Sequence, residues 1–108
     1  MENKTLAEIQ KEIDVLLQGY TKPYWSPLSN LARLAEEVGE VARILNHKYG
    51  DKPKKLTEAD DDLEDELADV LWSVIMLANQ EGVSLSNGVQ RAWDKLVVRD
   101  KDRFEKKV

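Results

Sequence analysis

The chain has 108 residues, no cysteine and a formal charge of −5 at pH 7. This length predicts a single domain over residues 1–108, and the composition, 42% hydrophobic and 34% charged, is typical of a folded protein rather than a disordered one. The acidic balance argues against a nucleic-acid binder, whose phosphate contacts need a basic surface. The N-terminus lacks a signal-peptide core, and the longest apolar stretch, Val70–Ala78, is too short to cross a bilayer. We therefore expect a cytoplasmic protein with no nucleic-acid partner and no membrane partner.

The first predicted helix covers residues 5–18. Thr5 and Glu8 have the spacing of a capping box, and Gly19 follows as a stop signal. Apolar residues recur at helical spacing along this segment, at Leu6, Ile9, Ile13, Leu16 and Leu17. An aromatic linker, residues 20–25, leads from this helix to the next.

The second predicted helix begins where Ser26 and Pro27 read as an N-cap followed by a proline in the first turn. It ends near Gly50, and its apolar positions are Leu28, Leu31, Leu34, Val38, Val41 and Leu45. The following segment, residues 51–56, is too polar to form a strand and contains a proline. It is therefore predicted to be a loop.

A third helix is predicted from an N-cap at Thr57 to about Gln80, with Gly82 as its terminator. A fourth helix is predicted after an N-cap at Ser84, and its apolar stripe is Leu85, Val89, Ala92, Trp93 and Leu96. No strand-like alternation of apolar and polar residues occurs between these segments. The predicted fold class is all-α, a four-helix bundle of antiparallel helices joined by short loops.

Two pairs of acidic residues have a spacing that places each pair on one face of a helix. Glu37 and Glu40 belong to the second predicted helix, and Glu66 and Asp69 belong to the third. Antiparallel packing can bring the two pairs face to face, where carboxylates repel one another unless a cation lies between them. A hard divalent ion with oxygen ligands would satisfy such a group.

The apolar sequence after Asp69 gives this cation-site hypothesis its weight. Residues 70–77 surround the helix axis almost completely with apolar side chains, so we expect this half of the helix, and Asp69 at its start, to be buried. A buried carboxylate must be protonated, paired or bound to a metal. A solvated acidic face is the alternative reading of the same residues.

At this point the residues resemble a known family, the MazG-like all-α NTP pyrophosphatases, and in particular its short, single-domain YpjD-type members. The resemblance rests on the motif EExxE followed on the next helix by ExxD, which stands here as EEVGE at residues 36–40 and ELAD at residues 66–69. It extends to the lead-in SPLSNLARLAEE, the loop NHKYGDKPKK and the terminal RDKDRF.

The resemblance implies hydrolysis of a (deoxy)nucleoside triphosphate to the monophosphate and pyrophosphate, with nucleotide-pool cleaning as the expected role. It implies Mg²⁺, with Mn²⁺ as a possible substitute, held by Glu37, Glu40, Glu66 and Asp69. The expected catalytic residues are Glu36, Glu37 and Glu40, of which Glu36 would assist a water molecule or a second metal ion. Hydrolysis of dUTP or dCTP, or cleavage of phosphoribosyl-ATP, are narrower alternatives.

The candidate substrate-binding residues are Trp25, Lys95, Arg99 and Arg103. Trp25 could stack on a nucleobase, or could instead pack against the end of the bundle. The three basic residues could contact phosphates, or could instead form a solvated basic helix end. Asp100 stands where the family usually has an asparagine, so the pattern of phosphate contacts departs from the family's.

The apolar character of the third helix also predicts self-association. Three neighbouring helices cannot cover it on every side, so we expect a homo-oligomer, at least dimeric, with Trp72 or Met76 in or beside the interface. The resemblance implies a homodimer or homotetramer. A second class of function remains open from the sequence. In that alternative the chain is a non-catalytic helical interaction module, and its acidic pairs hold a structural cation or bind a basic partner.

Overall fold

The computed structural model describes residues 1–57 and 62–107. These residues form four α-helices, α1 (Leu6–Leu17), α2 (Pro27–Tyr49), α3 (Leu63–Glu81) and α4 (Leu85–Asp94), and α4 continues into one π-helical turn, Lys95–Arg99. No strand occurs among the described residues, which confirms the predicted all-α class. Within the same residues, no helix has the length and apolar character needed to cross a membrane.

Most helix boundaries follow from the capping residues. Thr5 and Glu8 form the reciprocal capping box of α1, Ser26 caps α2 ahead of the proline, and Ser84 caps α4. The prediction of Thr57 as the N-cap of α3 is wrong, because Asp62 caps this helix through the backbone N–H of Glu64. Residues 58–61 of that predicted segment lie outside the described residues.

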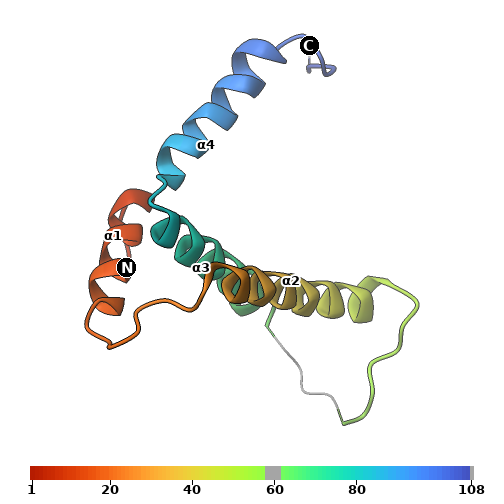
Figure 1. Cartoon of the computed structure of the whole chain (residues 1–108). Helices are drawn as coiled ribbons and strands as arrows, with labels where there is room; N and C mark the ends of the chain where they lie inside the picture. The colour runs from red at the N-terminus through yellow and green to blue at the C-terminus, as the bar shows by residue number, and fades with distance from the viewer. Residues whose placement is uncertain (58–61, 108) are drawn as a thin grey trace.

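Helices α2 and α3 lie side by side and antiparallel, and they form the body of the molecule (Figure 1). Helix α1 packs across the second half of α3, near its C-terminal end. Among the described residues, the buried apolar side chains come from α1 and α3, at Ile13, Ile75, Met76 and Ala78. The core is therefore small, and it lies in the half of α3 that is farther from the acidic residues.

A polar node joins α1 to the turn between α3 and α4. The side-chain amide of Gln10, which is buried, donates to Asn79 Oδ1 (3.0 Å) and to the carbonyl oxygen of Val83 (3.1 Å), and its oxygen accepts from the backbone N–H of Leu85 (2.9 Å). Asn79 in turn donates to the carbonyl oxygen of Gln10 (3.0 Å). One glutamine side chain thus connects three helices.

A second polar group anchors the segment that precedes α2. Asn30, which is only 1% exposed, donates to Gln80 Oε1 (2.9 Å), and both side chains donate to the carbonyl oxygen of Trp25. The hydroxyl of Tyr24 donates to Asp14 on α1 (2.5 Å). The backbone of the aromatic linker is therefore fixed to both α1 and α3, while the Trp25 side chain stays exposed.

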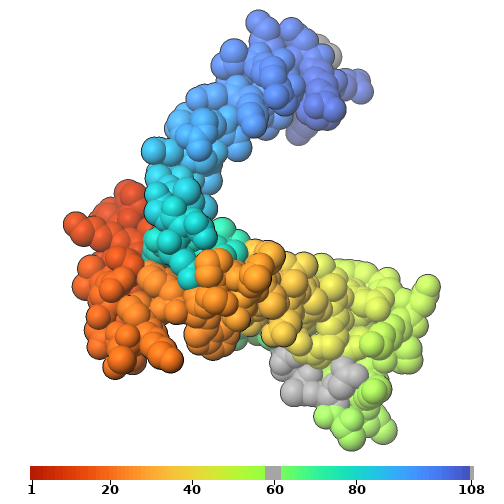
Figure 2. Space-filling model, viewed as in Figure 1, coloured from red at the N-terminus to blue at the C-terminus, as the bar shows by residue number. Residues whose placement is uncertain are grey.

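The last helix departs from the other three. Helix α4 turns away from α3 at Gly82 and projects from the body, and it touches the rest of the chain mainly through α1 (Figures 1 and 2). None of its residues is buried. The Cα radius of gyration is 17.7 Å, whereas a compact domain of this length would have about 13 Å. The expected four helices are present, but one chain does not close them into a compact bundle.

Candidate metal centre

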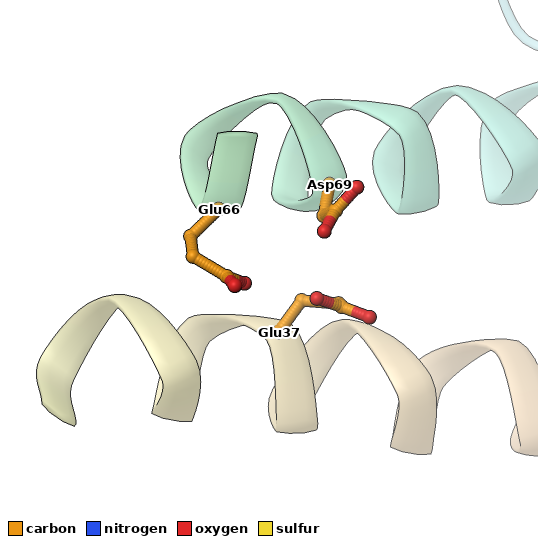
Figure 3. A group of neighbouring side chains, drawn as sticks. All are labelled: Glu37, Glu66 and Asp69. Carbon is orange, nitrogen blue, oxygen red and sulfur yellow. The ribbon is translucent and has the colours of Figure 1, made fainter. Parts of the chain in front are cut away.

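The facing sides of α2 and α3 carry a group of acidic side chains. On α2, the residues at positions 30, 34, 37, 41 and 44 recur every three or four residues and are buried or half-buried, so this side of the helix faces α3. Glu37 lies in the middle of this face, opposite Glu66 and Asp69 in the first turns of α3. Figure 3 shows these three side chains pointing toward one another from the two helices.

One carboxylate oxygen from each of Glu37, Glu66 and Asp69 lies within 4.8 Å of the others. Oxygen ligands bind a magnesium ion at about 2.1 Å, so ligands on opposite sides of one ion are separated by roughly 4 Å. The three carboxylates are thus close to the spacing that a single hard divalent cation requires. Their convergence confirms the inference that antiparallel packing brings acids of the two helices together.

The burial of this group differs from the expectation. Glu37 and Glu66 are half-buried, but Asp69 is exposed, so the expectation that Asp69 is buried is wrong. The cause is the small number of neighbours, because among the described residues α2 is the one helix that packs against this half of α3. Leu67 and Leu71, which flank Asp69 in sequence, are 51% and 50% exposed for the same reason.

The two other glutamates of the EEVGE motif lie beside the group rather than within it. Glu40 is one helical turn beyond Glu37, and its carboxylate accepts two hydrogen bonds from Arg43, at 3.1 and 2.7 Å. Glu36 is exposed and lies to one side of the face that meets α3. The structure thus brings together three of the four predicted metal ligands. Metal binding by all four, and the catalytic roles of Glu36, Glu37 and Glu40, stay predictions.

A cation and an aromatic ring extend the site along α2. Arg33 lies 3.9 Å from a carboxylate oxygen of Glu37, and its guanidinium lies 5.4 Å from the centre of the Trp25 ring. Sequence reasoning identified Trp25 but missed Arg33. The i,i+4 spacing of Arg33 and Glu37 was the available signal. Together these side chains form a continuous path from an exposed indole to the carboxylates.

The three predicted phosphate-binding residues lie at the other end of the molecule. Lys95 and Arg99 bound the π-helical turn after α4, and Arg103 follows it. Arg99 pairs with Asp100 (3.2 Å), and the guanidinium of Arg103 lies 5.4 Å from the centre of the Phe104 ring. Within one chain, none of these cations belongs to the acidic group.

A pair of antiparallel helices that presents converging carboxylates beside a cation and an exposed indole is suited to a nucleotide held through a divalent metal ion. The comparisons with known proteins agree with this class. The MazG nucleotide pyrophosphohydrolase domain matches residues 25–104, and the chain therefore belongs to the MazG family.

Two relatives match this chain over most of its length or about two thirds of it. YpjD of Bacillus subtilis is 46% identical over 107 residues, which is 99% of this chain and 96% of that protein. Gene 37 protein of Mycobacterium phage L5 is 45% identical over 71 residues, which is 65% of this chain and 61% of that protein.

Two solved structures share the fold. The crystal structure of Bacillus subtilis YpjD superposes with a TM-score of 0.76 at 45% identity, covering 88% of this chain and 97% of that one. The crystal structure of the Bacillus-conserved MazG protein, described as a nucleotide pyrophosphohydrolase, also gives a TM-score of 0.76, at 39% identity and covering 94% and 99%.

Proposed function

We propose that this protein hydrolyses a (deoxy)nucleoside triphosphate to the monophosphate and pyrophosphate in a Mg²⁺-dependent reaction, and that it serves nucleotide-pool cleaning in the cytoplasm. The observation that carries the proposal is the convergence of Glu37, Glu66 and Asp69 within 4.8 Å, in a chain of the MazG family. Mn²⁺, which accepts similar oxygen ligands, would be expected to substitute for Mg²⁺.

The donor set fits this ion. Three carboxylates from two helices supply the oxygen ligands that Mg²⁺ prefers, and the exposure of Asp69 leaves room for water and phosphate oxygens to complete the coordination. Glu40 would be a fourth ligand if its carboxylate turned from Arg43 toward the group. When bound, Mg²⁺ supplies neutralisation of the phosphate oxygens and polarises the phosphorus toward attack.

The remaining residues would bind and orient the substrate. The exposed Trp25 ring offers a stacking surface for a nucleobase. Arg33, between this ring and Glu37, is placed to contact a phosphate or the sugar end of a bound nucleotide. Glu36, exposed at the side of the group, would accept a proton from the attacking water. The water oxygen would form a bond to the α-phosphorus. The bond between the α-phosphorus and the oxygen that bridges the α- and β-phosphates would break, and this bridging oxygen would leave as part of pyrophosphate.

The alternative of a non-catalytic interaction module has one observation in its favour, the exposed apolar surface of α4. Exposed apolar patches of this kind mark sites of protein association. They do not distinguish an enzyme that associates with itself from a binding module, so the choice depends on activity.

The test is a screen of common and damaged triphosphates with Mg²⁺, read by separate assays for pyrophosphate and orthophosphate. We expect monophosphate and pyrophosphate from at least one substrate, and loss of this activity in Glu66→Gln and Asp69→Asn. Asp65→Asn, which removes an exposed carboxylate one residue from Glu66, is the matched control and should stay active. Calorimetry without nucleotide should show Mg²⁺ binding to the parent and to the control only.

Two outcomes would contradict the proposal. Release of orthophosphate and nucleoside diphosphate would show that the bond cleaved lies between the β- and γ-phosphates, not between the α- and β-phosphates. Inactivity over the whole panel, with Mg²⁺ still bound, would favour the interaction module with a structural cation.

A further inference from the structure

We propose that Arg43 binds the terminal phosphates of the substrate, and that it becomes available to them when Glu40 turns from it to the bound Mg²⁺. The proposal rests on the proposed function, because it assigns a residue to the polyphosphate of the same substrate. It adds a phosphate-binding cation beside the acidic group of the same chain, and it makes the availability of that cation depend on the metal ion.

The contact between Arg43 and Glu40 has the geometry of a phosphate contact. The guanidinium donates two hydrogen bonds to Glu40 Oε2, from Nε at 3.1 Å and from Nη2 at 2.7 Å. Both bonds end on the same oxygen, so Arg43 does not hold the second oxygen of this carboxylate. The planar group of donors in an arginine matches the oxygens of a phosphate as well as those of a carboxylate. Arg43 therefore presents the donors that a phosphate needs, and here Glu40 accepts from them.

Glu40 lies at the edge of the acidic group. It follows Glu37 by one helical turn on α2. On α3, Glu66 precedes Asp69 by one turn. Because the two helices are antiparallel, a step forward on α2 corresponds to a step back on α3, which places Glu40 on the side of Glu66. A change in the side-chain rotamer of Glu40 would therefore bring its carboxylate to an ion that the other three acids hold.

A metal ion and an arginine compete for this carboxylate. In the absence of a cation at the centre, Glu40 is favoured beside Arg43 because its other charged neighbour on this face, Glu37, is negative. A bound divalent ion attracts a carboxylate more strongly than one guanidinium does, and Mg²⁺ prefers charged oxygen ligands. When Glu40 turns to the ion, Arg43 loses the two bonds that it makes to Oε2. Phosphate oxygens can then accept them.

The order of residues along α2 gives the direction of the substrate. Trp25, the proposed stacking surface for the base, lies just before the helix, and Arg33 lies under its ring. Glu37 comes next, and Arg43 lies beyond it toward the C-terminal end of the helix. A nucleotide with its base on Trp25 and its α-phosphate at the metal centre therefore directs its β- and γ-phosphates toward Arg43. These two phosphates leave together as pyrophosphate, and a cation beside them offsets the charge that develops on the leaving group.

An ordinary surface ion pair is the competing explanation of the same contact. Opposite charges three residues apart on a helix often pair, and such pairs contribute little to stability. The side chains of Arg43 and Glu40 are 27% and 47% exposed, which allows this explanation. The two explanations differ in what removal of Arg43 does. An ordinary pair predicts no effect on either ligand, whereas the exchange predicts that Mg²⁺ binds more tightly and pyrophosphate more weakly.

Calorimetry without nucleotide measures the effect on the metal ion. Arg43→Gln should lower the Kd for Mg²⁺ about threefold, because Glu40 no longer has to leave an arginine. Lys48→Gln is the matched control. It removes the same charge from the same helix, at an exposed lysine that lies 5.2 Å from the centre of the Tyr49 ring. The Kd of this variant should match that of the parent, since a distant exposed charge is screened by salt.

A double-mutant cycle separates competition for Glu40 from a general effect of charge. In a Glu40→Gln background the contested carboxylate is absent. Arg43→Gln should then no longer tighten the binding of Mg²⁺. Arg43→Met, which keeps the apolar packing of the side-chain stem, should reproduce the behaviour of Arg43→Gln in both backgrounds, and it serves if the glutamine variant folds poorly.

Inorganic pyrophosphate, titrated in the presence of Mg²⁺, tests the phosphate assignment directly. Its Kd should rise about tenfold in Arg43→Gln through the loss of charge-assisted hydrogen bonds, and the KM for the triphosphate should rise by a similar factor. The Kd of the nucleoside monophosphate should not change, because its one phosphate lies at the metal centre and not beyond it. Lys48→Gln should match the parent for all three ligands.

The outcomes separate this proposal from the proposed function. An Arg43→Gln variant whose Mg²⁺ affinity is equal to or lower than that of the parent would overturn the exchange. Equal pyrophosphate affinity of parent and variant would overturn the assignment of the terminal phosphates, as would an equal loss of monophosphate affinity. A parent without activity on any triphosphate would instead defeat the proposed function, whatever these affinities are.

Discussion

The carboxylates at the α2–α3 contact repel one another in the absence of a cation. Glu37 is half-buried opposite Glu66 and Asp69, so replacing it removes repulsion as well as a proposed metal ligand. Without Mg²⁺, we expect Glu37→Gln to melt at the same temperature as the parent or higher. At a Mg²⁺ concentration a hundredfold above its Kd, the free energy of unfolding of the parent should rise by about 2.7 kcal/mol, and that of the variant should hardly change. Calorimetric melting with and without the ion measures both. If Mg²⁺ stabilised Glu37→Gln as much as the parent, Glu37 would not be a metal ligand.

Tyr24 gives a pH-dependent contribution to stability. Burial raises the pKa of its hydroxyl to about 12, and the hydrogen bond to Asp14 adds to the shift. A group with a folded-state pKa above its unfolded value stabilises the fold fully below the unfolded pKa, about 10 for tyrosine, and loses this contribution as pH rises toward 12.

We therefore expect Tyr24→Phe to be less stable than the parent by about 1 kcal/mol at pH 7, and this difference should shrink between pH 10 and 12. Urea unfolding of both proteins at matched pH measures the difference, and the comparison cancels the titration of lysines. A difference that stays constant to pH 12 would contradict the assigned cause.

At the scale of single residues, the i,i+3 spacing predicted that Glu66 and Asp69 share one face of α3, and the assumption of antiparallel packing placed Glu37 opposite them. Spacing could not predict the position of the Glu40 carboxylate, because the choice between the acidic group and Arg43 depends on side-chain rotamers. It also could not show the exposure of Asp69, which depends on how many helices pack against α3.

The turn between α3 and α4 depends on one glycine. Gly82 has φ of +68°, the left-handed conformation that a side chain disfavours, and an added Cβ would meet open space. Gly82→Ala should therefore destabilise the protein by about 1 kcal/mol through backbone strain alone. Gly88→Ala is the matched control inside α4, where open space also surrounds the added Cβ, and it should stabilise by up to about 1 kcal/mol. Chemical denaturation measures both, and a neutral Gly82→Ala would contradict the assigned strain.

At the scale of helices, capping residues predicted three of the four N-termini, because each cap is a local interaction between neighbours in sequence. The start of α3 was misplaced because several residues from Thr57 to Asp62 can cap, and local sequence does not rank them. The direction of α4 could not be predicted either. It follows from the Gly82 turn and from contacts of Gln10, a residue more than 70 positions away in sequence.

The whole molecule has more exposed apolar surface than a compact single chain would leave. We expect light scattering at micromolar concentration to report at least a dimer. Trp93→Glu, which places a charge in the exposed apolar stripe of α4, should lower the molecular mass of the particle that light scattering measures. Val15→Glu, at an equally exposed apolar position on α1, should not. A parent that is monomeric at this concentration would contradict self-association. The sequence indicated Trp72 or Met76 for such an interface, but Met76 is buried within its own chain, which leaves the half-buried Trp72.

The hydrogen bonds of the Gln10 side chain make it possible to measure how often α1 separates from the turn between α3 and α4. The two carboxamide protons of a buried glutamine that donates to Asn79 and Val83 are shielded from water. In a nuclear magnetic resonance spectrum they should exchange with deuterium far more slowly than those of the exposed Gln18 and Gln90. Their exchange rate is then a direct measure of how often α1 separates from the α3–α4 turn. Because the same side chain accepts from Leu85 N, that separation and the release of the first turn of α4 are one event, with one rate.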